Sequence, residues 1–314
     1  MARNARPLDG VLLFDKPLTL SSNIALQKVR RLFQAEKAGH TGTLDPLATG
    51  LLPICFGEAT KFSGALLDSD KTYRALVRLG QTSSTGDAEG EMTVVSERVP
   101  EEAQVCSALL GFIGEISQLP PMYSALKFEG KPLYEYIRSG LTIEREHRNV
   151  TIHELVLERY AGAEFEITVR CSKGTYIRTL AQDIGVALGC GAHLGGLRRI
   201  GTGRFGLEKA CSLEALEAMT MDQREACLLP VDCLLQNLPI FELDEVQMTR
   251  IAQGQRLAVT TALPDGKVRL YAGGQFIGTA DLAGPRLAPD RLMASVAQTA
   301  AVRVEKLSAA RICQ

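Results

Sequence analysis

The stretch Gly39-His40-Thr41-Gly42-Thr43-Leu44-Asp45-Pro46-Leu47-Ala48-Thr49-Gly50 organises the chain. Its glycines permit backbone conformations that are closed to other residues and let a ligand approach closely. Asp45-Pro46 is a turn-forming pair, because proline fixes its own φ and keeps the preceding residue out of the helical region. We therefore expect an irregular loop that presents the Asp45 carboxylate and the His40 ring. On this stretch alone, an ordinary surface turn explains the pattern equally well.

Length and composition indicate a globular protein. A chain of 314 residues is long enough for two domains, and 46% hydrophobic and 23% charged residues are ordinary values for this class. No apolar run approaches the roughly 20 residues of a membrane-spanning helix. The N-terminus also lacks the apolar segment of a secretory signal. We therefore expect a cytoplasmic protein that does not contact the membrane.

The cysteines and the net charge restrict the partners. The eight cysteines are scattered and none forms a Cys-x-x-Cys pair, so no metal site is predicted. Scattered cysteines without a signal sequence are typical of reduced, buried thiols in a cytoplasm. The net charge of −1 does not favour a nucleic-acid partner, although it says nothing about a local basic surface.

The elements around the Asp45 stretch alternate between strand and helix. Residues 10–14 are an apolar run that predicts a buried strand. A helix is expected to begin at Ser21 or Ser22, with Ile24 on its apolar face. A second helix is expected over about 58–67. The Asp45 loop is therefore expected between the first helix and the apolar segment 51–56 that leads to the second.

Residues 71–80 predict a half-buried strand. Apolar side chains and Tyr73 occupy every second position, and basic side chains such as Arg74 occupy the positions between them. Tyr73 is therefore expected on the buried face of the strand. Two further strands are expected over about 150–160 and 164–171.

The segment after residue 171 carries a second group of candidate site residues. It runs through a turn at Lys173-Gly174 into a helix that ends at 188–189. Tyr176 and Arg178 fall in or next to the first helical turn, so both can project from the strand end into a cleft. The ordinary alternative for Arg178 is a solvated helix residue. A glycine-punctuated strand with three arginines follows over 195–205.

The C-terminal quarter predicts a separate small module. Residues 230–239 have proline at both ends and are predicted to be a linker. After them we expect a helix over 243–252 and short strands, with a hairpin turn at 272–275. This pattern is typical of a small β-rich module.

The sequence restricts the possible chemistry. It contains no strand followed by Gly-x-Gly-x-x-Gly, no Walker loop, no Gly-x-Ser-x-Gly and no His-Glu-x-x-His. A lone carboxylate such as Asp45 can act as a nucleophile toward an anomeric carbon or an electron-poor ring. A glycosidase would need a second carboxylate as acid. Asp15 and Asp87 are candidates for it, but the sequence does not connect either to Asp45.

Several separated blocks, in a fixed order over nearly the whole chain, resemble the TruB family of bacterial tRNA pseudouridine synthases. The blocks are Asp15-Lys16-Pro17 with Ser21-Ser22, the stretch 39–50, Lys71-Thr72-Tyr73, Pro120-Pro121 with Tyr123-Ser124-Ala125-Leu126-Lys127, Lys173-Gly174-Thr175-Tyr176-Ile177-Arg178-Thr179, and Leu197-Arg198-Arg199. One block would be weak support, whereas all of them in order make coincidence improbable.

The resemblance implies an α+β fold. A pseudouridine synthase core is expected over 1–234, with a mixed, mainly antiparallel sheet, flanking helices and a central cleft. An RNA-gripping insertion is expected at about 121–148. The tail, 240–314, is similar to the small β-rich RNA-binding module called PUA.

The resemblance also implies roles for particular residues. Asp45 matches the catalytic aspartate and nucleophile. Tyr73 matches the tyrosine that stacks on the target base and is a candidate for proton transfer. Arg178 matches the arginine that pairs with the aspartate, and we expect two parallel hydrogen bonds between them. The remaining expected substrate-binding residues are His40, Lys16, Tyr176, Leu197 and Lys127.

The activity implied by the resemblance is the isomerisation of uridine to pseudouridine at position 55 in the T loop of tRNA. The family flips the base out of the loop and needs no cofactor and no metal. The expected partner is the T stem-loop of tRNA, and a monomer is expected. One alternative is a tRNA-binding or tRNA-folding chaperone in which isomerisation is secondary. A carboxylate hydrolase of small glycosides is what the residues alone allow.

Overall fold

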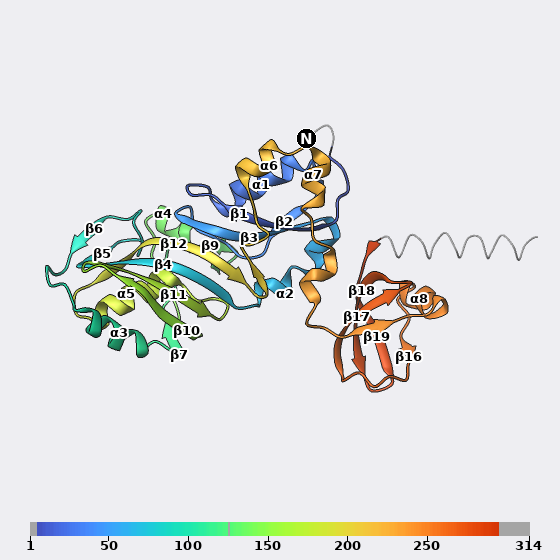
Figure 1. Ribbon diagram of the computed structural model, residues 1–314. Helices are drawn as coiled ribbons and strands as arrows, with labels where there is room; N and C mark the ends of the chain where they lie inside the picture. The colour runs from blue at the N-terminus through green and yellow to red at the C-terminus, as the bar shows by residue number, and fades with distance from the viewer. Residues whose placement is uncertain (1–4, 125, 295–314) are drawn as a thin grey trace, which may run out of the picture.

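The computed structural model describes residues 5–124 and 126–294 and contains two main β-sheets (Figure 1). The larger has ten strands in the order β14-β1-β3-β12-β4-β11-β10-β7, with β2 paired to β3 and β13 paired to β12. The second sheet has five strands in the order β15-β17-β18-β19-β16. Most strand pairs are antiparallel, while β1–β14, β3–β12 and β15–β17 are parallel. The expected α+β fold with a small C-terminal β-rich module is confirmed.

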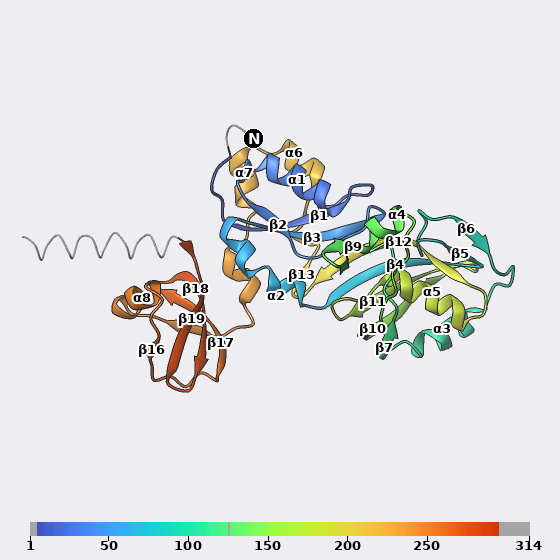
Figure 2. The same cartoon turned by 180° about the vertical axis from the view of Figure 1, so that it is seen from behind.

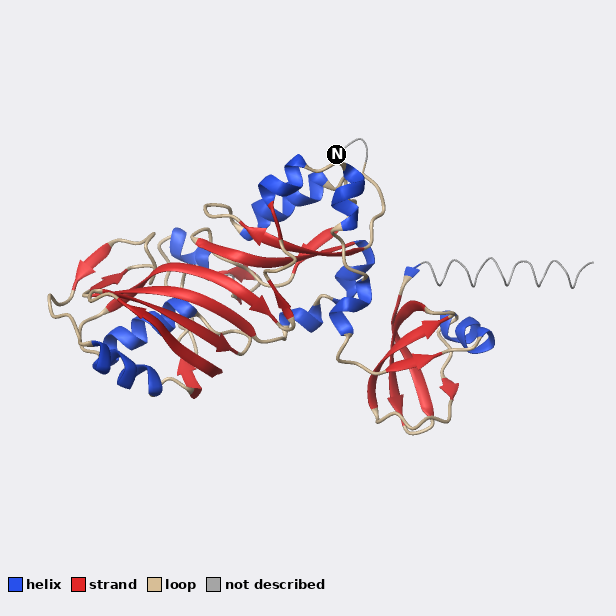
Figure 3. Ribbon diagram, in the orientation of Figure 1, coloured by secondary structure: helices blue, strands red, loops and turns tan. Residues whose placement is uncertain are grey.

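The elements are distributed along the chain as follows (Figure 3). The strands of the large sheet are β1 (Gly10–Lys16), β2 (Ala38–His40), β3 (Ala48–Phe56), β4 (Lys71–Leu79), β7 (Gly114–Gln118), β10 (Arg148–Tyr160), β11 (Glu164–Cys171), β12 (Ala192–Thr202), β13 (Phe205–Gly206) and β14 (Cys211–Ser212). Two small hairpins contain β5 (Gln81–Ser83) with β6 (Met92–Val94), and β8 (Lys127–Phe128) with β9 (Lys131–Pro132). The C-terminal strands are β15 (Ile240–Glu242), β16 (Leu257–Ala258), β17 (Gly266–Ala272), β18 (Gln275–Ala283) and β19 (Arg286–Leu292). The α-helices are α1 (Ser22–Leu32), α2 (Gly64–Leu67), α3 (Glu102–Leu110), α4 (Leu133–Arg138), α5 (Ile177–Ala187), α6 (Leu213–Ala218), α7 (Met221–Ala226) and α8 (Glu245–Ala252), and the 3₁₀ helices are η1 (Gly57–Phe62) and η2 (Val231–Leu235).

Strand β4 lies in the middle of the large sheet, between β12 and β11. Its side chains alternate as predicted, with Tyr73 and Ala75 buried and Arg74 and Arg78 exposed. Its buried face therefore forms part of the core, and Tyr73 belongs to that face.

Helices cover the two ends of the sheet (Figure 2). Helices α1 and α6 pack near β1, whereas α3 and α5 pack against β10, β4 and β12. One hydrophobic core joins both groups. Helix α1 begins as expected, because the Ser21 hydroxyl accepts a hydrogen bond from the Ile24 N–H at 3.3 Å. The expected burial of Ile24 is wrong, since 52% of this residue is exposed.

Two sequence-based assignments need correction. The helix expected over 58–67 is divided into the 3₁₀ helix η1 and the one-turn helix α2. The linker expected over 230–239 is instead largely structured, because η2 buries Val231 and Leu234. These side chains pack with Val11 of β1 and Phe62 of η1 in a separate core cluster. Strands β15 and β19 were not expected from the sequence.

The C-terminal sheet has its own core and also contacts the rest of the chain. The predicted hairpin at 272–275 is confirmed, since Ala272 pairs with Gln275 and both intervening glycines have positive φ. The Phe276 ring lies 5.5 Å from the Phe62 ring, and the Lys61 ammonium donates to the Leu292 carbonyl at 3.0 Å. Within the described part of the chain, no helix is long and apolar enough to cross a membrane.

Gly50 allows β3 and β12 to approach each other. It has a φ of 101° and pairs with Arg199, and a Cβ at this position would overlap the Arg199 carbonyl oxygen. We expect Gly50→Ala to lower the free energy of unfolding by about 2–4 kcal/mol, because it combines backbone strain with overpacking. Denaturant unfolding measures this effect. Gly64→Ala is the matched control, because its Cβ would meet nothing within 4 Å. Equal stability of Gly50→Ala and the wild type would contradict the close approach.

Candidate active site

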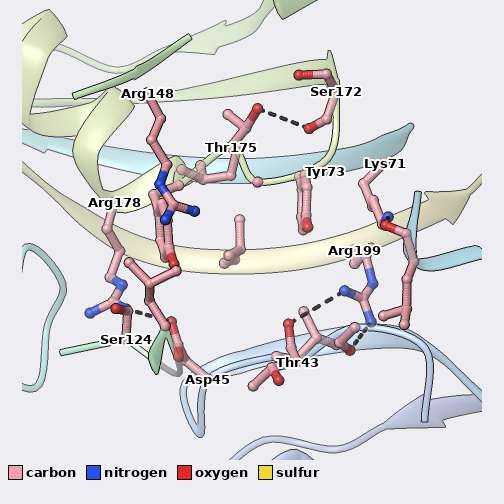
Figure 4. Close-up of a pocket in the computed structure, with 18 residues that line it drawn as sticks. Thr43, Asp45, Lys71, Tyr73, Ser124, Arg148, Ser172, Thr175, Arg178 and Arg199 are labelled. Atoms are coloured by element: carbon pink, nitrogen blue, oxygen red, sulfur yellow. Dashed lines mark hydrogen bonds and ion pairs between the residues drawn. The ribbon is translucent and has the colours of Figure 1, made fainter. Parts of the chain in front are cut away.

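A cavity of about 370 Å³ opens over β4 and β12, between the Asp45 loop and the turn that precedes α5 (Figure 4). Asp45 and Arg178 lie at one end of it, Lys71 and Arg199 lie at the other, and Tyr73 lies between these pairs. The lining residues come from segments far apart in sequence, and they are Gly42, Thr43, Leu44, Asp45, Leu67, Lys71, Tyr73, Ser124, Leu126, Arg148, Ser172, Gly174, Thr175, Tyr176, Ile177, Arg178, Leu197 and Arg199.

Hydrogen bonds from α1 fix the loop that carries Asp45. The buried Ser22 hydroxyl accepts from the Leu44 N–H at 2.7 Å and donates to the Leu44 carbonyl at 2.9 Å. On the other side of Asp45, the Pro46 carbonyl accepts from the Thr19 N–H at 2.9 Å. Asp45 is therefore held from both sides, and the alternative of an ordinary surface turn is wrong.

Arg178 is buried and contacts Asp45. Its Nη2 lies 3.1 Å from Asp45 Oδ2 and 2.6 Å from the Tyr123 carbonyl oxygen, and its Nη1 lies 3.1 Å from the Thr85 carbonyl oxygen. The alternative of a solvated helix residue is wrong, because Arg178 is only 5% exposed. The expectation of two parallel hydrogen bonds to Asp45 is also wrong. A single contact joins the two side chains, and Nη1 lies against the Thr85 carbonyl and Asp87 instead of the second Asp45 oxygen.

A second carboxylate, Asp87, contacts the same guanidinium. Asp87 is buried, and its Oδ2 lies 3.6 Å from Arg178 Nη1. Its Oδ1 accepts hydrogen bonds from the Thr85 hydroxyl at 2.5 Å and from the Glu89 N–H at 3.0 Å. The sequence did not connect this residue to Asp45, because the contact depends on where the 85–91 loop folds back onto β12 at Leu194.

The environment of Asp45 opposes its ionisation. Burial raises the pKa of the Asp45 carboxyl above its ordinary value of 3.8, and nearby Asp87 adds to the rise. The Arg178 and Lys16 cations act in the opposite direction. Arg178 is the larger of these two cationic influences, so it is the main neighbour that keeps Asp45 available as an anion.

Three of the expected site residues line the cavity beside Asp45. Tyr73 projects from β4, and Leu197 from β12. Tyr176 precedes α5, and its backbone is held by Gln118, whose side chain accepts from the Tyr176 N–H at 3.1 Å and donates to the Tyr176 carbonyl at 3.3 Å. The site therefore has an aromatic and aliphatic wall next to one carboxylate.

The other three expected residues do not line this cavity. His40 lines an adjoining cavity of about 580 Å³, which also includes Asp45 and Arg178, and its buried Nδ1 has no hydrogen-bond partner in the described structure. Lys16 is fully buried and donates to the Pro17 and Leu20 carbonyls at 2.9 and 2.6 Å. Burial lowers the Lys16 pKa to about 8, although Asp45 opposes the change. Lys127 is exposed on the small hairpin strand β8.

Two buried cationic residues that line the cavity had no role in the sequence-based prediction. Lys71 at the start of β4 donates to the carbonyls of Leu66, Leu67 and Ser69 at 3.0, 2.8 and 2.6 Å. Burial, reinforced by the nearby Arg199 charge, lowers the Lys71 pKa to about 8. Arg199 is 1% exposed on β12. It stands two residues after Leu197, so strand alternation alone places both side chains on one face.

The arrangement suits nucleophilic chemistry on a flat ring. Asp45 is held by Arg178 beside Tyr73, whereas Asp87 contacts the same arginine and lines the adjoining cavity that contains His40. Among the described residues, no group of three or more His, Cys, Asp or Glu side chains is placed to hold a metal ion. A partly buried carboxylate beside an aromatic side chain can attack an electron-poor ring or an anomeric carbon as a nucleophile.

Comparisons with known families cover nearly the whole chain. Residues 30–177 match the family described as TruB family pseudouridylate synthase (N terminal domain). Residues 178–236 match the tRNA pseudouridylate synthase B C-terminal domain, and residues 239–293 match Pseudouridine synthase II TruB, C-terminal.

Individual proteins agree with these matches. The chain is 57% identical over 300 residues to tRNA pseudouridine synthase B of Burkholderia mallei (strain NCTC 10247), covering 93% of this chain and 99% of that protein. It is 53% identical over 293 residues to the protein of the same name from Methylobacillus flagellatus, covering 93% and 97%. A crystal structure of a Cbf5-Nop10-Gar1 complex has the same fold, with a TM-score of 0.68, 24% identity, and coverage of 90% of this chain and 84% of that chain.

Proposed function

The chain belongs to the TruB family of pseudouridylate synthases, and from that membership we propose that its substrate is the uridine at position 55 in the T loop of tRNA. The enzyme is an isomerase that converts uridine to pseudouridine in tRNA. The observation that carries the finer proposal is the Asp45–Arg178 pair, which lies at the end of a cavity lined by Tyr73. A base inside a folded loop can reach Asp45 only if it leaves the loop.

Flipping and stacking set the energy balance of substrate binding. Extruding a nucleotide costs a few kcal/mol. Stacking on an aromatic side chain returns about 1–3 kcal/mol per base, and Tyr73 is the candidate. The cavity volume of about 370 Å³ lies within the usual range for small-ligand sites, about 300–1,000 Å³. We propose that Tyr176 and Leu197 complete the pocket for the extruded uracil.

The reaction needs one group that engages the ribose or the ring. The N1–C1′ bond breaks with its electron pair on the uracil, the uracil turns, and the pair at C5 forms the C5–C1′ bond. The hydrogen on C5 is then lost as a proton, and N1 gains one. We propose that Asp45 is the nucleophile, that the bond it forms to the ribose or the ring breaks again when C5 is joined to C1′, and that Arg178 orients it. Tyr73 is the candidate for the proton transfer at C5.

The remaining expected residues have positions that suggest supporting roles. The buried Lys16 ammonium favours the ionised form of Asp45 from behind the loop. The adjoining cavity with His40 suits a nucleotide next to the target, because the two cavities share Asp45 and Arg178. Lys127 is exposed on the segment 121–148, where it is available to an RNA phosphate.

We propose that the two parts of the chain have the separate roles that the resemblance implies. Residues 1–234 carry the chemistry, and the segment 240–314, of which the structure describes residues up to 294, adds RNA contact. We further propose that the enzyme acts as a monomer in the cytoplasm, where its tRNA substrate resides. The seven cysteines of the described residues are free, which suits a reducing compartment.

A labelled T stem-loop tests the proposed substrate. The RNA carries tritium at C5 of its uridines, and a second RNA has cytidine in place of uridine 55. We expect the wild-type protein to release tritium from the first RNA and none above background from the second. Equal release from both RNAs would place the modification elsewhere. Tight binding without release would favour the tRNA-folding alternative.

Removal of the C-terminal module tests its contribution to binding. A chain that ends after Leu238 should bind the T stem-loop more weakly and keep most of its single-turnover rate at saturating enzyme. The reason is that Asp45, Tyr73 and Arg178 all precede the cut. Thermal unfolding must accompany the test, because the cut removes Phe276 from its contact with Phe62. A large fall in the saturated rate of a folded truncated chain would contradict the prediction.

A further inference from the structure

Arg199 of β12 connects both arms of the Asp45 loop. Its Nη2 donates to the Gly42 carbonyl at 3.1 Å, and its Nη1 lies 3.5 Å from the Thr43 carbonyl oxygen. These carbonyls precede Asp45 in the chain. Its Nε donates to the Leu51 carbonyl at 2.7 Å, and Leu51 follows the loop. One planar guanidinium therefore fixes the entry and the exit of the segment that carries Asp45, and Figure 4 shows its bonds at the entry.

The same side chain reaches Tyr73. Arg199 and Tyr73 are paired across β12 and β4, so their side chains lie on the same face of the sheet. The positive charge of Arg199 also opposes the rise that burial causes in the pKa of the Tyr73 hydroxyl. Arg199 therefore bonds to the Asp45 loop and stands beside Tyr73 on the same face of the sheet.

Burying the charge of Arg199 lowers the stability of the fold, which suggests that the residue is retained for another role. The residue is 1% exposed, and its donors go to backbone carbonyls rather than to a carboxylate. Its charge also opposes the protonation of neighbouring His40, Lys16 and Lys71. A buried charge of this kind destabilises the fold relative to an apolar side chain of similar volume. Rules of packing are broken in this way mostly at functional sites.

We infer that Arg199 is a positioning residue for the isomerisation, which holds the Asp45 loop and the Tyr73 side chain in a fixed relation to each other. It acts through these two residues. A shift of about 1 Å in a reacting group can lower a rate by about 10²-fold. Loosening Arg199 should therefore reduce the chemical step and leave RNA affinity nearly unchanged.

The test compares Arg199→Met and Arg199→Lys with the wild-type protein. Arg74→Met is the matched control, because Arg74 is the residue next to Tyr73 and points to the exposed face of the same strand. Single-turnover rates at saturating enzyme and RNA dissociation constants are measured on the T stem-loop. We expect Arg199→Met to lower the rate by about 10²-fold with little change in affinity. Arg199→Lys should recover part of the rate, since an ammonium can bond one arm of the loop but cannot span both.

A double-mutant cycle separates positioning from a general loss of stability. If Arg199 acts through Tyr73, Arg199→Met should cost much less in a Tyr73→Phe background than in the wild type. If the fold losses in rate of the two single variants simply multiply in the double variant, the two residues act independently and the inference is wrong. So would a wild-type rate for Arg199→Met, or a loss of affinity that matches the loss of rate. If Arg199→Met does not fold, the Arg199→Lys measurements decide by the same criteria.

The inference rests on the proposed reaction at Asp45, and its failure can be told apart from failure of the proposed substrate. If the wild-type protein leaves the T stem-loop unchanged but modifies whole tRNA, the proposed position or minimal substrate is wrong. The Arg199 variants are then compared on whole tRNA. If the wild-type protein acts on the stem-loop and Arg199→Met acts equally well, only the positioning role is wrong.

Discussion

Asp45→Asn is expected to reduce pseudouridine formation by more than about 10³-fold while RNA binding remains, because an amide cannot serve as the nucleophile. The substitution keeps the size of the side chain and one carbonyl oxygen within reach of Arg178. Tritium release in a single turnover, with enzyme in excess over RNA, measures the chemical step directly. Asp222→Asn on the exposed surface of α7 is the matched control and should match the wild type.

The same variant makes a prediction about stability. Burial raises the pKa of Asp45 in the folded protein, so folding favours its protonated form. Ionisation of Asp45 therefore costs stability as the pH rises from the ordinary value of 3.8 through the raised one. At neutral pH, Asp45→Asn should unfold at the same temperature as the wild type or at a higher one. An inactive variant that is also much less stable would weaken the catalytic assignment.

Arg178→Met is expected to be the second most damaging change. It removes the principal neighbour that keeps Asp45 ionised, and it leaves the Thr85 and Tyr123 carbonyls without their donor. The change also takes away the partner of the buried Asp87 carboxylate, and removal of one partner from a buried ion pair costs about 3–5 kcal/mol of stability. We expect a rate loss of at least about 10²-fold at neutral pH, because a misoriented Asp45 reacts poorly.

The pH dependence makes this prediction specific. Arg178 lowers the pKa of Asp45, so its loss raises that pKa further, and the acidic limb of the rate profile should move to higher pH. Part of the lost rate should return at alkaline pH. Arg170→Met is the control, since Arg170 is exposed on β11 and pairs with Asp70. An unshifted acidic limb would remove Arg178 from the control of Asp45.

Local sequence patterns predicted several elements of the fold correctly. The alternation of residues 71–80 predicted which face of β4 holds Tyr73, and the structure confirms it. The hairpin turn at 272–275 and the start of α1 after Ser21 are confirmed for the same reason, because each depends on residues a few positions apart. The resemblance to the TruB family supplied the global arrangement, which periodicity alone did not.

Contacts between segments that are far apart in the chain could not be predicted from the sequence. The burial of η2 depends on Val11 and Phe62, which lie far from it in sequence, so proline at both ends of 230–239 did not reveal the packed 3₁₀ helix in the first half of that segment. Asp87 joins Arg178 only because the 85–91 loop returns to β12. The donors of Arg178 are divided between Asp45 and two backbone carbonyls, a geometry that a pairing of residue types does not reveal. Arg199 was not predicted as a site residue, and alternation with Leu197 along the strand does not reveal the backbone carbonyls that its side chain bonds.

The most direct test of the account is the structure of the protein bound to a T stem-loop with 5-fluorouridine at position 55. Fluorine at C5 cannot leave as a proton, so the reaction should stop with the altered nucleotide still in the site. We expect the extruded ring to stack against Tyr73 and the nucleotide to contact the Asp45 carboxylate. A base that stays stacked in its loop, or one that occupies a site remote from Asp45, would contradict it.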